Sequence, residues 1–387
     1  MNIWIFFLLI AGIMSKEDSS YMANDSLKTM VLFEQNTDGY HTYRIPSLIV
    51  TPKGTVLAFA EGRKNSGSDT GDIDLLLRRS FDGGKTWDKQ QVIWDDGPHV
   101  CGNPTPVVDE QTGTIWLLLT WNRGDDQERD IIAKRSQDTR RVYVMSSDDE
   151  GATWTRAKDI TATTKDPSWG WYATGPGVGI QIQHGPHKGR LVIPCDHSYD
   201  DPSGIVGGGG YDYGAHSIYS DDHGKTWQLG GTIRPKANEC QVVELADGEG
   251  TLLMNIRSYF GRNLRTHAWS KDGGINWSDP QDAVGLVEPV CQASLIRHSW
   301  PTKSNKSILL FANPASTKRE NLSVKLSQDE GKSWPYSRTL YPGPAAYSSL
   351  ATLPDGFVLC LYENGTNGPY EKITLARFDI DWLYNNK

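Results

Sequence analysis

The sequence is poor in cysteine, in basic relative to acidic residues, and in long hydrophobic runs, and each shortage excludes a class of protein. Five cysteines occur among 387 residues, and none forms a CxxC pair. This excludes a disulfide-dense scaffold and a CxxC-type zinc site. Lysine and arginine number 39 against 47 acidic residues, a net charge of −8. That balance disfavours nucleic acid and anionic membranes as partners, so an anionic ligand would need a local cluster of arginines.

The one long apolar run lies at the N-terminus. Residues 3–13 are too few to span a bilayer but are typical of the core of a signal peptide. We therefore expect residues 1–20 to be a leader, with no transmembrane segment after it, and a secreted or periplasmic protein. No lysine or arginine precedes the run, which is atypical of a leader.

Helical periodicity is also missing, whereas short runs of β-forming residues between glycine- and proline-rich loops are frequent. This pattern predicts an all-β fold. Clear runs occur at residues 55–60, 115–119, 142–145, 191–194, 252–256, 307–312 and 357–362. No segment reads as a linker between domains. We predict that residues 21–387 form a single domain.

The motif Ser-x-Asp-x-Gly-x-x-Trp, an Asp box, occurs five times without a mismatch. The copies are Ser80–Trp87, Ser147–Trp154, Ser220–Trp227, Ser270–Trp277 and Ser327–Trp334. Their mean separation of about 62 residues suits a propeller blade of four strands. The chain then holds about six such units, one of them without the motif. The repeats predict a six-bladed β-propeller with Asp-box hairpins.

Each Asp box has the residues of a tight hairpin. Asp and Ser can bond nearby backbone groups, Gly accepts a positive φ, and Trp packs beside the turn. Calcium binding is the functional alternative. However, Ca²⁺ takes six to eight oxygens, and each box offers one invariant carboxylate. We predict that the boxes are structural and that the protein needs no metal or other cofactor.

A Tyr-Arg-Ile-Pro sequence at residues 43–46, followed by the five boxes, resembles the exo-α-sialidases (neuraminidases) of the bacterial and animal type, glycoside hydrolase family 33. The resemblance covers nearly the whole chain after the leader. It implies a six-bladed propeller with its active site on the axis. It also implies that three arginines bind the carboxylate of sialic acid, a task suited to bidentate guanidinium groups. They correspond to Arg44, Arg257 and Arg319, with Lys318 and Arg338 near the third.

The same resemblance implies an acid/base on a loop soon after the first arginine. Asp69, Asp72 and Asp74 lie in this stretch. Asp72 and Asp74 alternate into the strand that follows, whereas Asp69 lies in a Gly/Ser-rich segment whose mobility would help it close on substrate. Asp69 is therefore the expected acid/base, and Asp72 is the alternative.

Sialidases differ from most glycosidases in using a tyrosine nucleophile. A carboxylate nucleophile would repel the carboxylate of the substrate, whereas a phenol, with an ordinary pKa of about 10, needs only a base to remove its proton. The resemblance implies Tyr347 as the nucleophile and Glu239 as its base. It implies that Glu363 orients Arg44, and that Arg63 and Asn103 contact the sugar on its O4 side. Many bacterial relatives carry Asp at the position of Asn103.

These residues predict an exo-α-sialidase that releases terminal sialic acid from glycoproteins, oligosaccharides and glycolipids such as gangliosides, with retention. Two alternatives stay open. A trans-sialidase would use the same residues and pass the sugar to another glycan. A non-catalytic sialic-acid-binding propeller would keep the arginines but usually lose Asp69, Glu239 or Tyr347, and all three are present.

Overall fold

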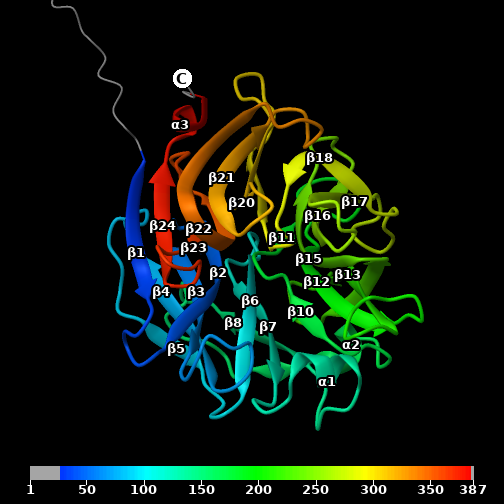
Figure 1. The fold of residues 1–387 in the computed structure, drawn as a ribbon. Helices are drawn as coiled ribbons and strands as arrows, with labels where there is room; N and C mark the ends of the chain where they lie inside the picture. The colour runs from blue at the N-terminus through cyan, green and yellow to red at the C-terminus, as the bar shows by residue number, and fades with distance from the viewer. Residues whose placement is uncertain (1–26, 385–387) are drawn as a thin grey trace, which may run out of the picture.

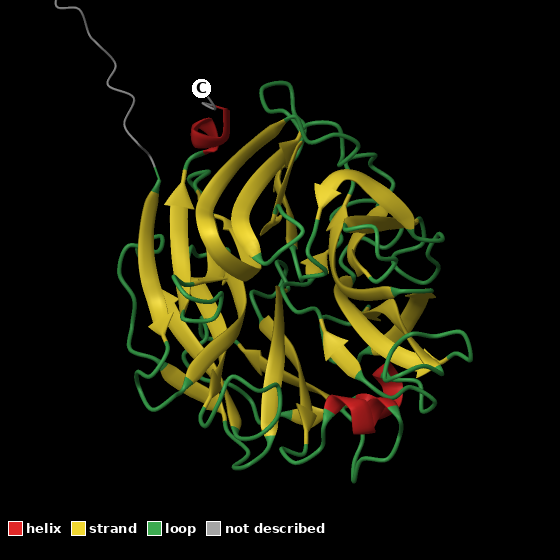
Figure 2. Ribbon diagram, in the orientation of Figure 1, coloured by secondary structure: helices red, strands yellow, loops and turns green. Residues whose placement is uncertain are grey.

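The computed structural model describes residues 27–384, and these form an all-β protein with three short helices (Figures 1 and 2). The predicted all-β class is confirmed. Neighbouring strands pair antiparallel throughout this part of the chain, apart from one parallel residue pair, Ile73 with Val100. No helix between residues 27 and 384 is long and apolar enough to cross a bilayer. The expected leader lies outside the described residues.

The first half of the chain builds two sheets. The eight-stranded sheet comprises β2 (Thr42–Val50), β3 (Val56–Arg63), β4 (Ile73–Ser80), β5 (Gln91–Trp94), β6 (Val100–Val108), β7 (Ile115–Asn122), β8 (Arg141–Ser147) and β9 (Lys158–Asp159). The five-stranded sheet comprises β10 (Tyr172–Thr174), β11 (Ile180–Gln181), β12 (Leu191–Asp200), β13 (Tyr211–Ser220) and β14 (Gln228–Ile233). Helices α1 (Glu128–Ile132) and α2 (Thr161–Thr164) follow β7 and β9.

The second half builds a four-stranded and a seven-stranded sheet. The four-stranded sheet comprises β15 (Ala237–Glu244), β16 (Leu252–Ser258), β17 (Leu264–Ser270) and β18 (Gln281–Val287). The seven-stranded sheet comprises β19 (Ser294–Ser299), β20 (Ile308–Pro314), β21 (Glu320–Ser327), β22 (Tyr336–Thr352), β23 (Val358–Asn364), β24 (Lys372–Phe378) and the N-terminal β1 (Lys28–Glu34). Helix α3 (Ile380–Tyr384) follows β24.

The two ends of the described chain meet in the seven-stranded sheet. Strand β1 pairs antiparallel with β24, from Lys28 opposite Arg377 to Glu34 opposite Lys372, so blue lies beside red in Figure 1. Strand β22 is shared within this sheet, because its first part pairs with β21 and its second part with β23. Both termini are therefore tied into one hydrogen-bonded layer.

The hydrophobic core lies between successive groups of strands. Strands β3 and β23 are buried along their whole length, whereas β1 and β18 are mostly exposed. Leu48 of β2 belongs to the same apolar cluster as Leu359 and Leu375 of β23 and β24, and Val243 of β15 to the same cluster as Phe311 of β20. A strand buried on both faces reads as a near-continuous apolar run, which explains the runs seen in the sequence.

All five Asp boxes adopt one geometry, at the turn that follows β4, β8, β13, β17 or β21. In each, the Ser hydroxyl donates to the Asp carboxylate at 2.8–2.9 Å. The same hydroxyl accepts the Gly N–H. The carboxylate also accepts the N–H four residues further on. Such bonds favour the ionised form, and those from Thr153 lower the pKa of Asp149 to about 2.

The box glycines also pack on the preceding group of strands. Gly224 has φ +82°, and a Cβ built on it would lie 2.1 Å from Cε2 of Trp116 on β7. Likewise, a Cβ on Gly84 of the first box would lie 3.2 Å from Leu375 on β24. Only a residue without a side chain allows so close an approach. The first box thus contacts the C-terminal strands as later boxes contact their predecessors.

We expect Gly224→Ala to lower the free energy of unfolding by about 3 kcal/mol, because the methyl group adds overpacking to the strain of a positive φ. Gly248→Ala is the matched control, with φ +78° and no atom within 4 Å of the built Cβ. It should cost only about 1 kcal/mol, from backbone strain. Urea unfolding of both variants measures the difference. Equal losses would contradict a close contact at Gly224.

Candidate active site

One cavity of about 340 Å³ gathers the residues predicted for the site. Eight of the nine line it: Arg44, Arg63, Asp69, Asn103, Glu239, Arg257, Arg319 and Tyr347. The ninth, Glu363, is fully buried directly behind Arg44. They come from distant parts of the chain, so only the tertiary fold brings them together.

Irregular backbone aims several of these side chains into the cavity. The ladders of β2, β6, β15 and β22 each shift register at the position of a site residue: Arg44, Asn103, Glu239 and Tyr347. Ile45 and Asn103 have positive φ values of 59° and 53°, uncommon outside glycine. A bulge interrupts the alternation of side chains and so re-aims one of them.

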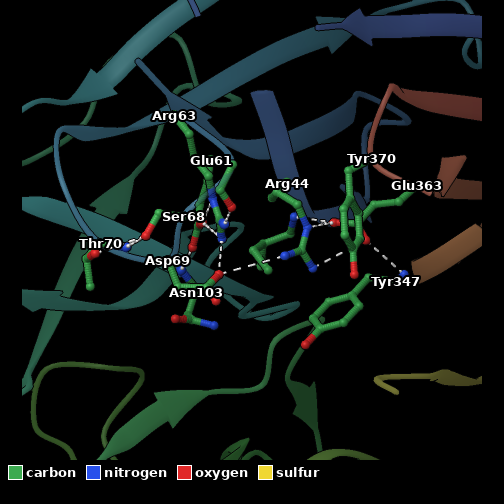
Figure 3. Close-up of polar contacts among 12 residues, drawn as sticks. Arg44, Glu61, Arg63, Ser68, Asp69, Thr70, Asn103, Tyr347, Glu363 and Tyr370 are labelled. Atoms are coloured by element: carbon green, nitrogen blue, oxygen red, sulfur yellow. Dashed lines mark hydrogen bonds and ion pairs between the residues drawn. The ribbon is translucent and has the colours of Figure 1, made fainter. Parts of the chain in front are cut away.

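Glu363 on β23 fixes both Arg44 and Tyr347. Its Oε1 accepts Nε of Arg44 at 2.8 Å and the N–H of Ile45 at 2.9 Å. Its Oε2 accepts the N–H of Tyr347 at 3.1 Å (Figure 3). Burial opposes the charge of Arg44, but Glu363 outweighs it, and the pKa of Arg44 is raised well above its ordinary value. The guanidinium is therefore charged and held in place before any ligand arrives.

Tyr347, Glu239 and Arg257 form a hydrogen-bonded group. The hydroxyl of Tyr347 donates to Oε1 of Glu239 in a short hydrogen bond. Arg257 Nη1 donates to Oε2 of Glu239 at 2.6 Å and to the Tyr347 hydroxyl at 3.3 Å. Burial and the neighbouring Glu239 raise the pKa of Tyr347 well above its ordinary value. The phenol thus keeps its proton in this arrangement, beside a carboxylate able to take it.

Arg319 lies at the turn between β20 and β21, on the other side of the tyrosine ring. Its guanidinium lies 5.6 Å from the ring centre of Tyr347, and Nη1 donates to the hydroxyl of Tyr370 at 2.5 Å. Tyr370 also lies under Arg44, 4.1 Å from the guanidinium carbon. Of the alternatives for the third arginine, Lys318 and Arg338 do not line the cavity, and Arg338 donates to Trp382 O instead.

Asp69 is the carboxylate of the 64–72 loop that lines the cavity. Its side chain is 63% exposed, with Oδ1 at 2.7 Å from Arg63 Nη2 and 3.7 Å from Arg44 Nη1 (Figure 3). Loss of solvent raises its pKa, but the charges of Arg63 and Arg44 outweigh this and leave it below the ordinary value. The alternative, Asp72, pairs with Lys64 at 2.9 Å and does not line the cavity.

Arg63 and Asn103 form a wall of hydrogen-bond donors. Arg63 pairs with Glu61, whose other oxygen accepts the N–H of Asn103 at 2.9 Å. The side-chain oxygen of Asn103 accepts Thr120 at 3.1 Å and also Arg140, so the amide NH₂ is the group left for a ligand.

Several cavity residues were missed from the sequence. They are Glu61, Glu128, Arg140, Trp171, Asp196, Tyr213, Tyr259 and Tyr370. None lies in a motif used for the prediction, and none has a spacing that marks it. A proline after a strand residue, as at Ile45 and Asn103, is a usable signal, because proline within a sheet indicates a bulge.

Together these features define a class of protein: an Asp-box β protein whose cavity holds several arginines beside a tyrosine–glutamate pair. The family described as BNR repeat-like domain matches residues 54–360. The chain is 35% identical over 358 residues to a sialidase of Micromonospora viridifaciens, covering 89% of this chain and 53% of that relative. It is 32% identical to Sialidase-2 of Cricetulus griseus, covering 88% of this chain and 93% of that relative.

Solved structures give the same likeness. Hadza microbial sialidase Hz136 matches with a TM-score of 0.77 and 31% identity, over 89% of this chain and 67% of that one. A leech intramolecular trans-sialidase matches with a TM-score of 0.77 at 20% identity, over 93% and 71%, which is a likeness of fold alone. The chain spans only about half the length of the Micromonospora relative. It belongs to the sialidase family of glycoside hydrolases.

We expect Glu363→Gln to lower the free energy of unfolding by about 3 kcal/mol, because it removes the buried charge partner of Arg44 and leaves only the mostly exposed Asp69, 3.7 Å away. The matched control is Glu34→Gln, in the exposed pair with Lys372, which should cost less than about 1 kcal/mol. Urea unfolding at neutral pH compares them. A loss at Glu363 no larger than at Glu34 would show that Arg44 does not depend on this carboxylate.

Proposed function

We propose that the protein is an exo-α-sialidase that hydrolyses terminal α-linked sialic acid with retention of configuration. The observation that carries this proposal is the Tyr347 hydroxyl bonded to Glu239 between the guanidiniums of Arg44, Arg257 and Arg319. A neutral nucleophile among three cations suits a sugar whose anomeric carbon bears a carboxylate. Glycoproteins, oligosaccharides and glycolipids are the proposed substrates.

In the first step, the arginines bind the carboxylate and place the anomeric carbon over Tyr347. Asp69, protonated, gives its proton to the glycosidic oxygen as the bond to the aglycone breaks. The oxygen of Tyr347 bonds to the anomeric carbon, and its proton passes to Glu239. General acid and base catalysis of this kind contributes about 10²–10⁴-fold each. The product is a sialyl–tyrosine intermediate and a free aglycone.

In the second step, the ionised Asp69 takes a proton from water, whose oxygen attacks the anomeric carbon. The bond to Tyr347 breaks, and Glu239 returns the proton to the phenolate. Two inversions give net retention, and every group ends as it began. The exposed position of Asp69 supports this role, since both the aglycone and the water must reach it.

Asp69 must be protonated to act as an acid, yet two arginines lower its pKa in the empty site. A bound carboxylate partly neutralises Arg44, so binding should raise the pKa of Asp69 again. Substrate binding would thereby favour the protonated form of Asp69 that the first step requires. The arginines serve two purposes in this mechanism: they bind the substrate and they couple binding to protonation.

We further propose that the four sheets form six blades in a closed ring. The blades are β2–β5, β6–β9, β10–β14, β15–β18, β19 to the first part of β22, and the rest of β22 with β23, β24 and β1. Contacts of the first box with β23 and β24 support closure. The five boxes belong to the first five blades, and the sixth has none. A crystal structure tests the ring directly.

We also propose that residues 21–387 form a single domain and that the protein is exported after removal of a leader. The apolar run of residues 3–13 supports export. N-terminal sequencing of protein recovered outside the expressing cell tests it, and an intact Met1 there would contradict cleavage.

We expect the pH profiles of kcat and of kcat/KM to differ at their alkaline limbs. The limb of kcat/KM reports Asp69 in the free enzyme, and that of kcat reports it in the complex. Because binding raises the pKa of Asp69, kcat should persist to higher pH than kcat/KM. Steady-state rates from pH 3 to 8 with 3′-sialyllactose measure both limbs. Coincident limbs would contradict coupling between Arg44 and Asp69.

We expect Tyr347→Phe to reduce the release of fluorophore from an aryl sialoside by at least about 100-fold, because among residues 27–384 no other phenol is bonded to Glu239. Tyr341→Phe is the control, since its hydroxyl donates to Gly365 O outside the cavity. Turnover that survives in Tyr347→Phe would mean a different nucleophile.

EDTA should leave the wild type active. Added lactose distinguishes hydrolysis from transfer, and no turnover by folded wild type would favour a binding protein.

A further inference from the structure

A second wall of the cavity, distinct from the arginines, carries two acidic side chains without ion-pair partners among residues 27–384. Glu128 of α1 accepts the Tyr213 hydroxyl at 2.5 Å, and Asp196 of β12 lies beside Asn238. This wall offers carboxyl and hydroxyl groups, whereas the wall of Arg63 and Asn103 offers donors only. The two walls therefore suit different parts of a ligand.

Asp196 is 1% exposed, and one of its oxygens has no partner in the described part of the chain. Oδ1 accepts Nδ2 of Asn238 at 3.0 Å, whereas Oδ2 is buried without a hydrogen bond. Its cross-strand neighbours are Ala173 and Ala215, both small and neither with a side-chain polar group to pair this oxygen. An unpaired buried oxygen is costly, and a ligand group could satisfy it.

The chemistry of that oxygen follows from its surroundings. Burial and the nearby Glu239 raise the pKa of Asp196 well above its ordinary value, which favours the neutral acid. Because Asn238 donates to Oδ1, we assign that oxygen as the carbonyl and the unpartnered Oδ2 as the O–H of an acid that lines the cavity. A hydroxyl of the ligand can accept a hydrogen bond from this O–H group. The same hydroxyl can donate in turn to Glu128 or to another acceptor of this wall.

We propose that Asp196 is a specificity-determining residue that hydrogen-bonds a hydroxyl of the polyhydroxylated side chain of sialic acid. The assignment rests on the proposed function and extends it to the sugar's tail. The carboxylate of the sugar goes to the arginines, and Arg63 and Asn103 are expected at the O4 side of the ring. The tail is the part of sialic acid with adjacent free hydroxyls, and the wall of Glu128 and Asp196 can form hydrogen bonds with them. Substrates with a shortened or O-acylated tail should bind less well.

The test combines two substrates with three proteins. Mild periodate oxidation followed by borohydride reduction shortens the tail of an aryl sialoside. We expect about a tenfold higher KM for the shortened substrate with wild type, as for the loss of one buried hydrogen bond. Asp196→Leu should raise KM for the intact substrate about tenfold, with kcat within about threefold, and should no longer distinguish the substrates. Asp196→Asn, whose NH₂ can donate from the same place, should recover most of the affinity.

If Asp196→Leu raises KM by the same factor for both substrates, or lowers kcat at constant KM, the proposal is overturned. Either result would mean that Asp196 acts through Glu239. An unchanged wild-type KM on tail shortening would overturn it without any variant. Asp109→Asn, at a buried carboxyl outside the cavity, is the matched control, and thermal unfolding reports folding. If wild type cleaves neither substrate, the proposed function fails. Calorimetry of free sialic acid and its shortened form then tests Asp196 alone, and equal affinities would overturn it.

Discussion

The carboxylate of Glu363 is the interaction on which the site depends. It has no contact with solvent, yet it accepts hydrogen bonds from Arg44, from the backbone of Ile45 and from the backbone of Tyr347. These groups belong to β2 and β22, which lie near opposite ends of the chain and in different sheets, and Glu363 itself comes from β23, the strand paired with β22. One buried charge therefore joins the ends of the fold, orients an arginine and fixes the backbone of the tyrosine. A buried ion pair is weak evidence for stability. Its value here is that it holds a cation and a phenol in one arrangement before a ligand binds.

The charged residues of the cavity differ in the kind of partner that each one has. Arg44 and Arg257 each have a dedicated carboxylate, Glu363 and Glu239, so both stay charged when buried. Arg319 has a phenol, Tyr370, and a backbone oxygen instead, which leaves its charge available to a ligand. Asp69 is the one mostly exposed acid, and its pKa is governed by the same arginines that would bind the substrate. Binding and acid strength are thus properties of one network, and a change at Arg44 should affect both.

The sequence was informative where residues repeat or lie in a motif. Five Asp boxes and the all-β runs predicted the class of fold, and the residues around Arg44, Glu239 and Tyr347 predicted a cavity that the structure assembles. Asp196, Glu128, Arg140 and Tyr370 could not be found in this way, because each reaches the cavity through tertiary packing alone. Asp196 looks like any polar residue of a strand, and its unpaired oxygen exists only once Ala173 and Ala215 lie on either side of it. Asp69 was preferred over Asp72 on the family resemblance and on its place in a Gly/Ser-rich loop before the strand that takes Asp72. In the structure Asp69 lines the cavity, whereas Asp72 pairs with Lys64 and does not.

In each repeat, the Asp-box residues that stabilise the fold and the residues of the site lie at different positions. Asp boxes follow the third long strand, where Ser and Asp close a turn with the same bonds five times over, and their glycines pack on the preceding strands. Four site residues, Arg44, Asn103, Glu239 and Tyr347, lie where the ladder of a first strand shifts register, and three others, Arg63, Arg257 and Glu363, lie at the ends of second strands. Strained backbone persists only where surrounding structure over-determines it. The regular boxes supply that support, and so the irregular strands are free to differ from one repeat to the next. A site with one acid, one nucleophile and three unequal arginines requires such asymmetry, which a strictly repeated inner strand would not provide.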